Sequence, residues 1–173
     1  DVIDKNAILD ACKAARTISA GHSMSAQGIN LTNNSLAPLY VQDNPLESLT
    51  REQKIALMNK ANEVARSADS RVDQVDVSLG QVHRLMLVVN TDGVISADVK
   101  PIVQFNVSVV MKNGDRHESG HSSMGGSYLL DELLKDNAYE KVALDAVRMA
   151  SVNLESILAP AGSMPVVLGA GWP

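Results

Sequence analysis

His117-Glu118-Ser119-Gly120-His121 is the stretch whose residue types and spacing most directly match a catalytic pattern. In zinc peptidases His-Glu-x-x-His lies on a helix, which places both imidazoles on one face and the glutamate beside the metal-bound water. That chemistry requires the helix. Here the pattern follows an Asn113-Gly114 hairpin signal, contains Gly120 and runs into further glycines, so we expect a strand instead.

On a strand, successive side chains point to opposite faces, so His117, Ser119 and His121 share one face and Glu118 points to the other. The glutamate is then removed from the position in which it would activate water. We therefore interpret His117, Glu118 and His121 as a coincidental match on a solvated hairpin arm, with no metal bound. A free-standing zinc peptidase that uses these three residues is the less favoured alternative.

Glycines form two further candidate sites. The stretch from Gly120 to Gly126 is predicted to be a loop whose bare backbone lets a peptide or a partner subunit approach Gly120, Gly125 and Gly126. The alternative is a flexible turn after a hairpin. It is not a phosphate loop, because it lacks the lysine and the strand-to-helix setting. Gly169 and Gly171 belong to a predicted sharp turn that leads to a following helix, and we include them as contact candidates.

Composition excludes some classes of function. The 173 residues carry a net charge of −5, and their basic residues are scattered, whereas a nucleic-acid site needs a clustered basic face. No run of 18 apolar residues predicts a membrane span. Cys12 is the single cysteine, so no internal disulfide is possible. Its place in a helical apolar pattern predicts a buried core residue.

The elements that must position these residues follow from periodicity. Residues 1–49 are predicted to form a helix and a polar connector, and residues 50–70 an amphipathic helix opened by a Thr50–Gln53 capping box. Residues 72–121 alternate as strands of an antiparallel sheet, with 82–89 as a more central strand because it is densely apolar.

Residues 127–173 are predicted to contain helices and a final strand. One or two helical turns precede Asn137, which is expected to cap a long, buried helix that ends at Pro160 and Gly162. Met164 to Leu168 is expected to form a short buried strand. Strands between flanking helices indicate an α+β fold with an antiparallel-rich mixed sheet. Since the chain begins with Asp1 and stops after a turn, we expect a single fragment, 1–173, truncated at both ends.

The last fifteen residues, Ala159 to Pro173, read APAGSMPVVLGAGWP, and this segment resembles the TldD/TldE (PmbA) family of metal-dependent peptidases. Weaker tracts fall in the same order as in that family. They are Pro38-Leu39-Tyr40, Asp43 to Leu49, Thr91-Asp92-Gly93, Ala97 to Pro101, and Ala146 to Leu154. The ending is more similar to the TldD branch than to TldE, its partner subunit.

The resemblance implies that this chain is the central scaffold and partner-interface fragment of a cytoplasmic bacterial zinc peptidase. It places a His-Glu-x-x-x-His helix beyond Pro173, so the fragment alone would be inactive and bind no zinc. It also implies a TldE/PmbA-like partner subunit and unfolded peptide substrates, such as microcin precursors or antitoxins, with no nucleic acid or membrane involved. The alternative from another class is a non-catalytic, TldE-like binding or assembly module.

Overall fold

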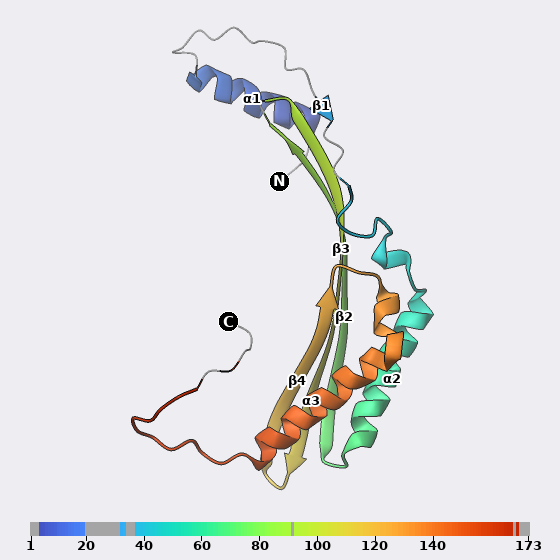
Figure 1. Cartoon of the computed structure of the whole chain (residues 1–173), viewed down its shortest axis with the longest axis vertical. Coiled ribbons are helices and arrows are strands. Elements are labelled where there is room, and N and C mark those ends of the chain that lie inside the picture. Colours follow the sequence, from blue (N-terminus) through green and yellow to red (C-terminus); the bar gives the residue numbers. More distant parts are fainter. Residues whose placement is uncertain (1–3, 20–31, 34–36, 91, 168, 170–173) are drawn as a thin grey trace. The chain divides into compact units, whose positions relative to one another are not determined.

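The computed structural model describes residues 4–19, 32–33, 37–90, 92–167 and 169 (Figure 1). It confirms the α+β class, with helices before and after a group of strands. The chain divides into two compact units. One unit is Asp1–Asn34 with Val88–Ser96, and the other is Ser35–Leu87 with Ala97–Pro173.

The first unit contains α1 (Lys5–Ser19) and β1 (Thr32–Asn33). β1 pairs in parallel with Val94–Ile95, which makes the sheet mixed, as predicted. Cys12 is exposed on α1, so the prediction that it is buried is wrong. The apolar pattern around it is amphipathic, but no described residue covers it. Of the predicted polar connector, residues 20–31 and 34–36 lie outside the described residues.

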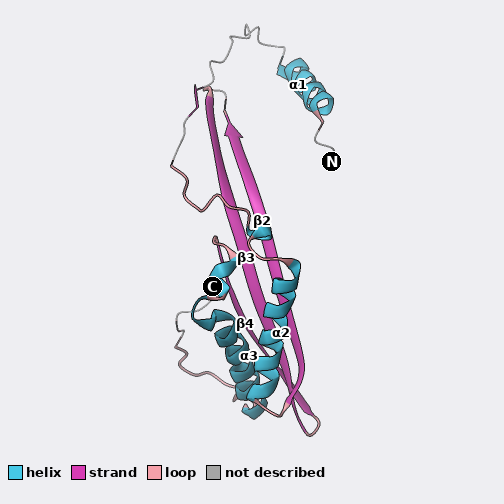
Figure 2. Ribbon diagram, turned by 90° about the vertical axis from the view of Figure 1, so that its right-hand side faces the viewer, coloured by secondary structure: helices cyan, strands magenta, loops and turns pink. Residues whose placement is uncertain are grey.

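Three long strands form the rest of the sheet, β2 (Val72–Val89), β3 (Val94–Asn113) and β4 (Arg116–Gly126), with β3 in the middle (Figure 2). Residues 72–87, 97–113 and 116–126 of these strands belong to the second unit. β3 and β4 are antiparallel and are joined by the predicted Asn113-Gly114 turn, where Gly114 has a φ of +60°. The Asn90 amide donates to the Val94 carbonyl at the other end of β3. Asn106 contacts Ser78 further along, so β2 and β3 are also antiparallel.

One expectation for these strands is wrong. Residues 82–89 do not form a more central strand, because β2 lies at the edge of the sheet and leaves Leu85 and Leu87 72% and 67% exposed. β3 contains a proline, Pro101, and continues through it. Pairing with β4 stops at Val103 and Gly126, so Pro101 lies where its missing N–H is not needed.

Two helices cover one face of these strands. α2 (Arg51–Ala68) opens with the predicted capping box, in which the Gln53 amide donates to Thr50 Oγ1 and the Thr50 amide donates to Gln53 Oε1. α3 (Ala138–Glu155) packs on β4 and on α2. The core between helices and sheet is mostly aliphatic, and its largest fully buried side chains include Phe105, Met111, Leu130, Leu133, Val103, Val107 and Val109.

The helical turns before α3 are 3-10 segments, Leu130–Leu133 and Lys135–Asn137. Asn137 is the N-cap, as predicted, but its left-handed backbone leaves the side chain without a capping hydrogen bond. A short 3-10 turn, Pro45–Glu47, also precedes α2. None of the described helices is both long and apolar enough to cross a membrane.

α3 ends at Glu155, five residues before Pro160. Ile157 and Leu158, expected inside a buried helix, lie beyond it and are 90% and 96% exposed. Residues 164–167 do not form the expected final strand, and residue 168 lies outside the described residues. The apolar residues at 157–158 and 164–167 therefore lie in backbone that is neither helix nor strand.

The predicted glycine-rich loop is also wrong, because residues 116–126 form β4 throughout. The glycine at position 120 has a packing reason. A Cβ built there would lie 2.2 Å from the Ala146 carbonyl oxygen and 2.2 Å from the Ala150 nitrogen, both backbone atoms of α3. Ala146 and Ala150 are themselves fully buried. Gly120 thus lets α3 approach β4 to backbone distance.

We expect Gly120→Ala to lower the free energy of unfolding by at least about 2 kcal/mol, because the methyl group must displace helix backbone. Gly80→Ala is the matched control, since a Cβ on β2 at that position meets nothing closer than 3.8 Å. Its effect should stay within about 1 kcal/mol. Urea unfolding followed by circular dichroism measures both. Equal effects of the two substitutions would contradict the packing role of Gly120.

Candidate functional site

The His-Glu-x-x-His pattern lies on β4, where His117 pairs with Lys112, Glu118 with Met111, and His121 with Ser108. The two histidines are exposed on the face that no described helix covers. Their Cα atoms are about 13 Å apart, from four residues at about 3.3 Å each. Glu118 lies on the helix-covered face and pairs with Arg116 at 3.1 Å. The backbone therefore does not form the arrangement of a helical zinc peptidase.

The five glycine candidates are not gathered into one site. Gly120 is buried under α3. A Cβ at Gly126 would lie 2.3 Å from the Tyr128 ring, and one at Gly125 would lie 2.8 Å from the Val103 carbonyl oxygen. Gly125 is exposed on the open face of β4, and Gly169 has no neighbour within 4 Å of a Cβ position. Gly171 lies outside the described residues.

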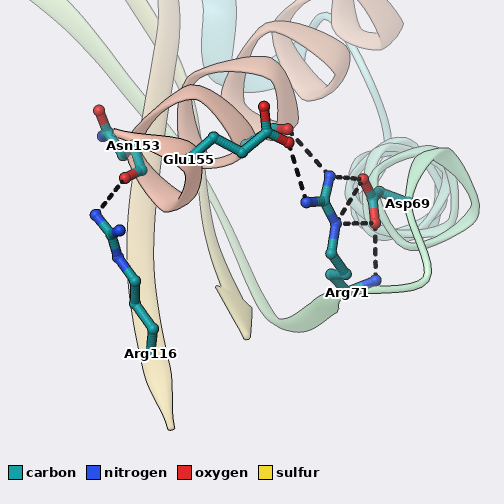
Figure 3. Close-up of polar contacts among 6 residues, drawn as sticks. Asp69, Arg71, Arg116, Asn153 and Glu155 are labelled. Atoms are coloured by element: carbon teal, nitrogen blue, oxygen red, sulfur yellow. Dashed lines mark hydrogen bonds and ion pairs between the residues drawn. The ribbon is translucent and has the colours of Figure 1, made fainter. Parts of the chain in front are cut away.

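The most developed polar cluster lies at the C-terminal end of α3, and its first part is Arg71 (Figure 3). The Arg71 guanidinium binds Asp69 with Nη2 2.7 Å from Oδ2, and it reaches Glu155 Oε1 at 3.2 Å. It also donates to Ser151 Oγ at 3.1 Å. Arg71, next to the first residue of β2, is thereby tied to side chains on the last turns of α3.

The second part of this cluster is Arg116, the first residue of β4 (Figure 3). Its Nη2 donates to the Asn153 carbonyl and its Nη1 to the Ser156 carbonyl, each at 2.9 Å. Asn153 Nδ2 in turn donates to the Ser119 carbonyl of β4 at 2.8 Å. We call Arg71 and Arg116, together with the last turn of α3, the arginine clamp.

Charge pairing perturbs the clamp on the Arg71 side. Hydrogen bonds from the Arg71 side chain and then from its backbone N–H lower the pKa of Asp69 to about 2. The same pair raises the pKa of Arg71, with a further contribution from Glu155. Sequence reasoning missed this cluster because Arg71 and Glu155 are 84 residues apart and share no local pattern.

A second feature is an apolar pocket of about 280 Å³ between α2 and the start of α3. Leu57, Leu134 and Tyr139 line it, and Lys60 is its single charged lining residue. It brings no acid and base together. Among the described residues, no group of three or more His, Cys, Asp or Glu could hold a metal ion. The described part of the chain thus has an anchored helix end, and its His-Glu-x-x-His residues and glycine candidates are not gathered into one site.

Comparison with known proteins identifies the family of this chain. Residues 44–154 match the family model described as the PmbA/TldA metallopeptidase central domain. The chain therefore belongs to the PmbA/TldD metallopeptidase family, as its ending and internal tracts predicted. The matched range contains α2, β2, β3, β4 and all but the last residue of α3, whereas α1 and β1 lie outside it.

Two curated relatives are both described as "Metalloprotease TldD homolog". The protein of Haemophilus influenzae is 40% identical over 168 residues, covering 95% of this chain and 34% of the relative. The protein of Buchnera aphidicola subsp. Schizaphis graminum is 38% identical over 149 residues, covering 83% of this chain and 31% of the relative. The chain thus spans about a third of the length of these relatives.

The fold is also found in a solved structure of a putative modulator of a DNA gyrase from Thermotoga maritima. The TM-score is 0.64 at 18% identity, covering 86% of this chain and 33% of that one. At this identity the likeness concerns the fold alone.

We expect the purified chain to bind less than about 0.1 zinc ion per molecule, because a zinc site needs three or four convergent ligands. His117→Ala should leave this value unchanged, since His117 lies about 13 Å from His121 along the strand. Metal analysis after dialysis measures both. Near-stoichiometric zinc that is lost in His117→Ala would place a metal site on β4 and overturn our interpretation of the pattern.

The Asp69–Arg71 pair should make stability fall in acid. Because folding lowers the pKa of Asp69 from 3.8 to about 2, its contribution is fully present above about pH 4 and is lost as the pH falls towards 2. We expect about 1 kcal/mol after solvent screening. Asp69→Asn should remove this part of the pH dependence of unfolding. Asp145→Asn, which breaks an exposed pair with Arg148, is the control and should leave it unchanged.

Proposed function

We propose that this chain is the central scaffold of a TldD-type zinc peptidase, with the catalytic metal held by residues beyond Pro173. The observation that carries the proposal is 40% identity to a metalloprotease TldD homolog across 95% of the chain. The alignment covers 168 residues, so the similarity is not confined to one tract. Bound zinc would polarise the scissile carbonyl and lower the pKa of its water towards ~7.

The role of the described residues in this proposal is architectural. α2 and α3 stiffen one face of the sheet, and the arginine clamp anchors the end of α3 from which the chain leaves. No step of peptide hydrolysis is assigned to His117, Glu118 or His121, because the two histidines are far apart on a strand. We therefore propose that the fragment alone is inactive.

We further propose that substrates are unfolded peptides, such as microcin precursors or antitoxins, and that the enzyme works in the bacterial cytoplasm. A free strand edge is a general means of binding extended peptides by main-chain hydrogen bonds. Both outer strands have one outward carbonyl already occupied, Asp73 by Arg66 and Ser119 by Asn153. The remaining edges of β2 and β4 are the surfaces we propose for peptide addition.

A TldE/PmbA-like subunit is the partner we propose. Of the glycine candidates, Gly125 and Gly169 are the described ones that another chain could approach, since Gly120 is covered by α3 and Gly126 by Tyr128. Gly171 stays a candidate outside the described residues.

The alternative is a non-catalytic, TldE-like binding or assembly module. The name of the matched family model includes both PmbA and a metallopeptidase, so the central domain alone does not separate the two. The continuation of the open reading frame does. A His-Glu-x-x-x-His helix after Pro173 supports the peptidase, and its absence supports the binding module.

We expect the full-length protein, expressed with a TldE-like subunit, to cleave an unstructured peptide and to lose this activity when a chelator removes its metal. Added zinc should restore it. The 173-residue chain, assayed in parallel, should be inactive with and without zinc. Chelator-resistant cleavage would contradict metal-assisted hydrolysis, and cleavage by the chain alone would place the catalytic residues within it.

A further inference from the structure

The last residue that the helix-and-sheet unit holds in place is Ser156. After it, residues 157–167 are all exposed, and the described residues 157–167 and 169 make no hydrogen bond or ion pair with the rest of the chain. Packing therefore does not set the direction in which this segment leaves. The contacts that do so are made by Arg116 to Asn153 and Ser156.

Arg116 suits this position because α3 ends without a glycine cap. Its last turn leaves carbonyl groups without helical partners, and Ser156 is extended with φ −67° and ψ 149°. A guanidinium has planar, forked donors that can bind two acceptors at once. Arg116 uses them to join the carbonyls of Asn153 and Ser156, and its charge is favourable at a helix C-terminus.

We propose that Arg116 is a positioning residue for the metal centre. By holding Asn153 and Ser156 against β4, it sets the direction of residues 157–167 and thereby the placement of the helix that the proposed function puts after Pro173. This inference rests on the proposed function, which places the metal-binding helix after Pro173. Arg116 itself touches neither metal nor substrate.

Arg71 provides a matched comparison, because it binds the same turns of α3 through side chains only. Its partners there are Ser151 Oγ and Glu155 Oε1. Removing Arg71 should loosen α3 on β2 but leave the exit of the chain at Ser156 held by Arg116. A purely structural role predicts that both arginines affect activity in proportion to stability. A positioning role predicts that removing Arg116 lowers activity by more than its effect on stability accounts for, whereas removing Arg71 does not.

The kinetic test uses the full-length enzyme with Arg116→Ala, Arg116→Lys, Arg71→Ala and, as a neutral control, Arg148→Ala in the exposed pair with Asp145. We expect Arg116→Ala to lower kcat about 10- to 100-fold with little change in KM, because displacements near 1 Å cost about this much. Arg116→Lys should recover part of the loss, since an ammonium keeps the charge without the fork. At equal loss of Tm, Arg71→Ala should lower kcat less.

A structural test needs no activity. Nitroxide labels at Gln74 on β2 and at Val167, in full-length protein with Cys12→Ser and any other cysteines replaced, report the distance between the sheet and the exit segment. Because Arg116 fixes the start of the segment at Ser156, double electron–electron resonance should give a narrower distribution with Arg116 than with Arg116→Ala, or one centred at a different distance. The Arg71→Ala distribution should stay close to that of the unsubstituted protein.

The outcomes separate the two proposals. An unchanged distance distribution in a folded Arg116→Ala protein, or a kcat loss no greater than that of Arg71→Ala at equal Tm, overturns the positioning role. If Arg116→Ala does not fold, the same comparisons are made with Arg116→Lys. If the unsubstituted full-length protein neither binds metal nor cleaves peptide, the proposed function fails, and the label distances alone then decide whether Arg116 directs the segment.

Discussion

The contact between Gly120 of β4 and the backbone of α3 is the constraint on which the rest of the larger unit depends. Because no side chain separates them, helix and strand meet at backbone distance, with Ala146 and Ala150 filling the remaining space. This approach sets the height of α3 over the sheet. The height in turn decides whether Arg71 and Arg116 can reach the last turns of the helix.

Local signals in the sequence were sufficient for several elements. The Thr50–Gln53 pair defined the start of α2 because a capping box is a contact within four residues. Asn113-Gly114 defined the β3–β4 turn because a tight turn depends on the conformational freedom of its own residues. The strand assignment of residues 117–121 followed from the same turn, and it separated the histidines from the glutamate.

Contacts between distant residues were not accessible in this way. The stretch from Gly120 to Gly126 suggested a loop because glycine is flexible. Gly120 instead allows the close approach of α3, a helix that begins 18 residues later in the chain. Residues 157–158 and 164–167 suggested buried elements because they are apolar, although nothing described covers them. The arginine clamp joins positions 37 to 84 residues apart, and no spacing rule marks such pairs. Family resemblance identified the family of the chain, which spacing rules could not do, because the resemblance draws on the order of many weak tracts.

The length and exposure of β2 have a consequence for handling this chain in solution. An 18-residue edge strand offers an unpaired ladder of amides and carbonyls, and its outer part adds exposed Leu85, Leu87 and Val88. Natural proteins usually protect such edges with charge, proline or a covering element, because bare ones recruit other strands. The edge of β2 is thus a surface on which another strand could pair, and a lysine in place of Leu85 or Leu87 would add the kind of charge that usually protects such edges.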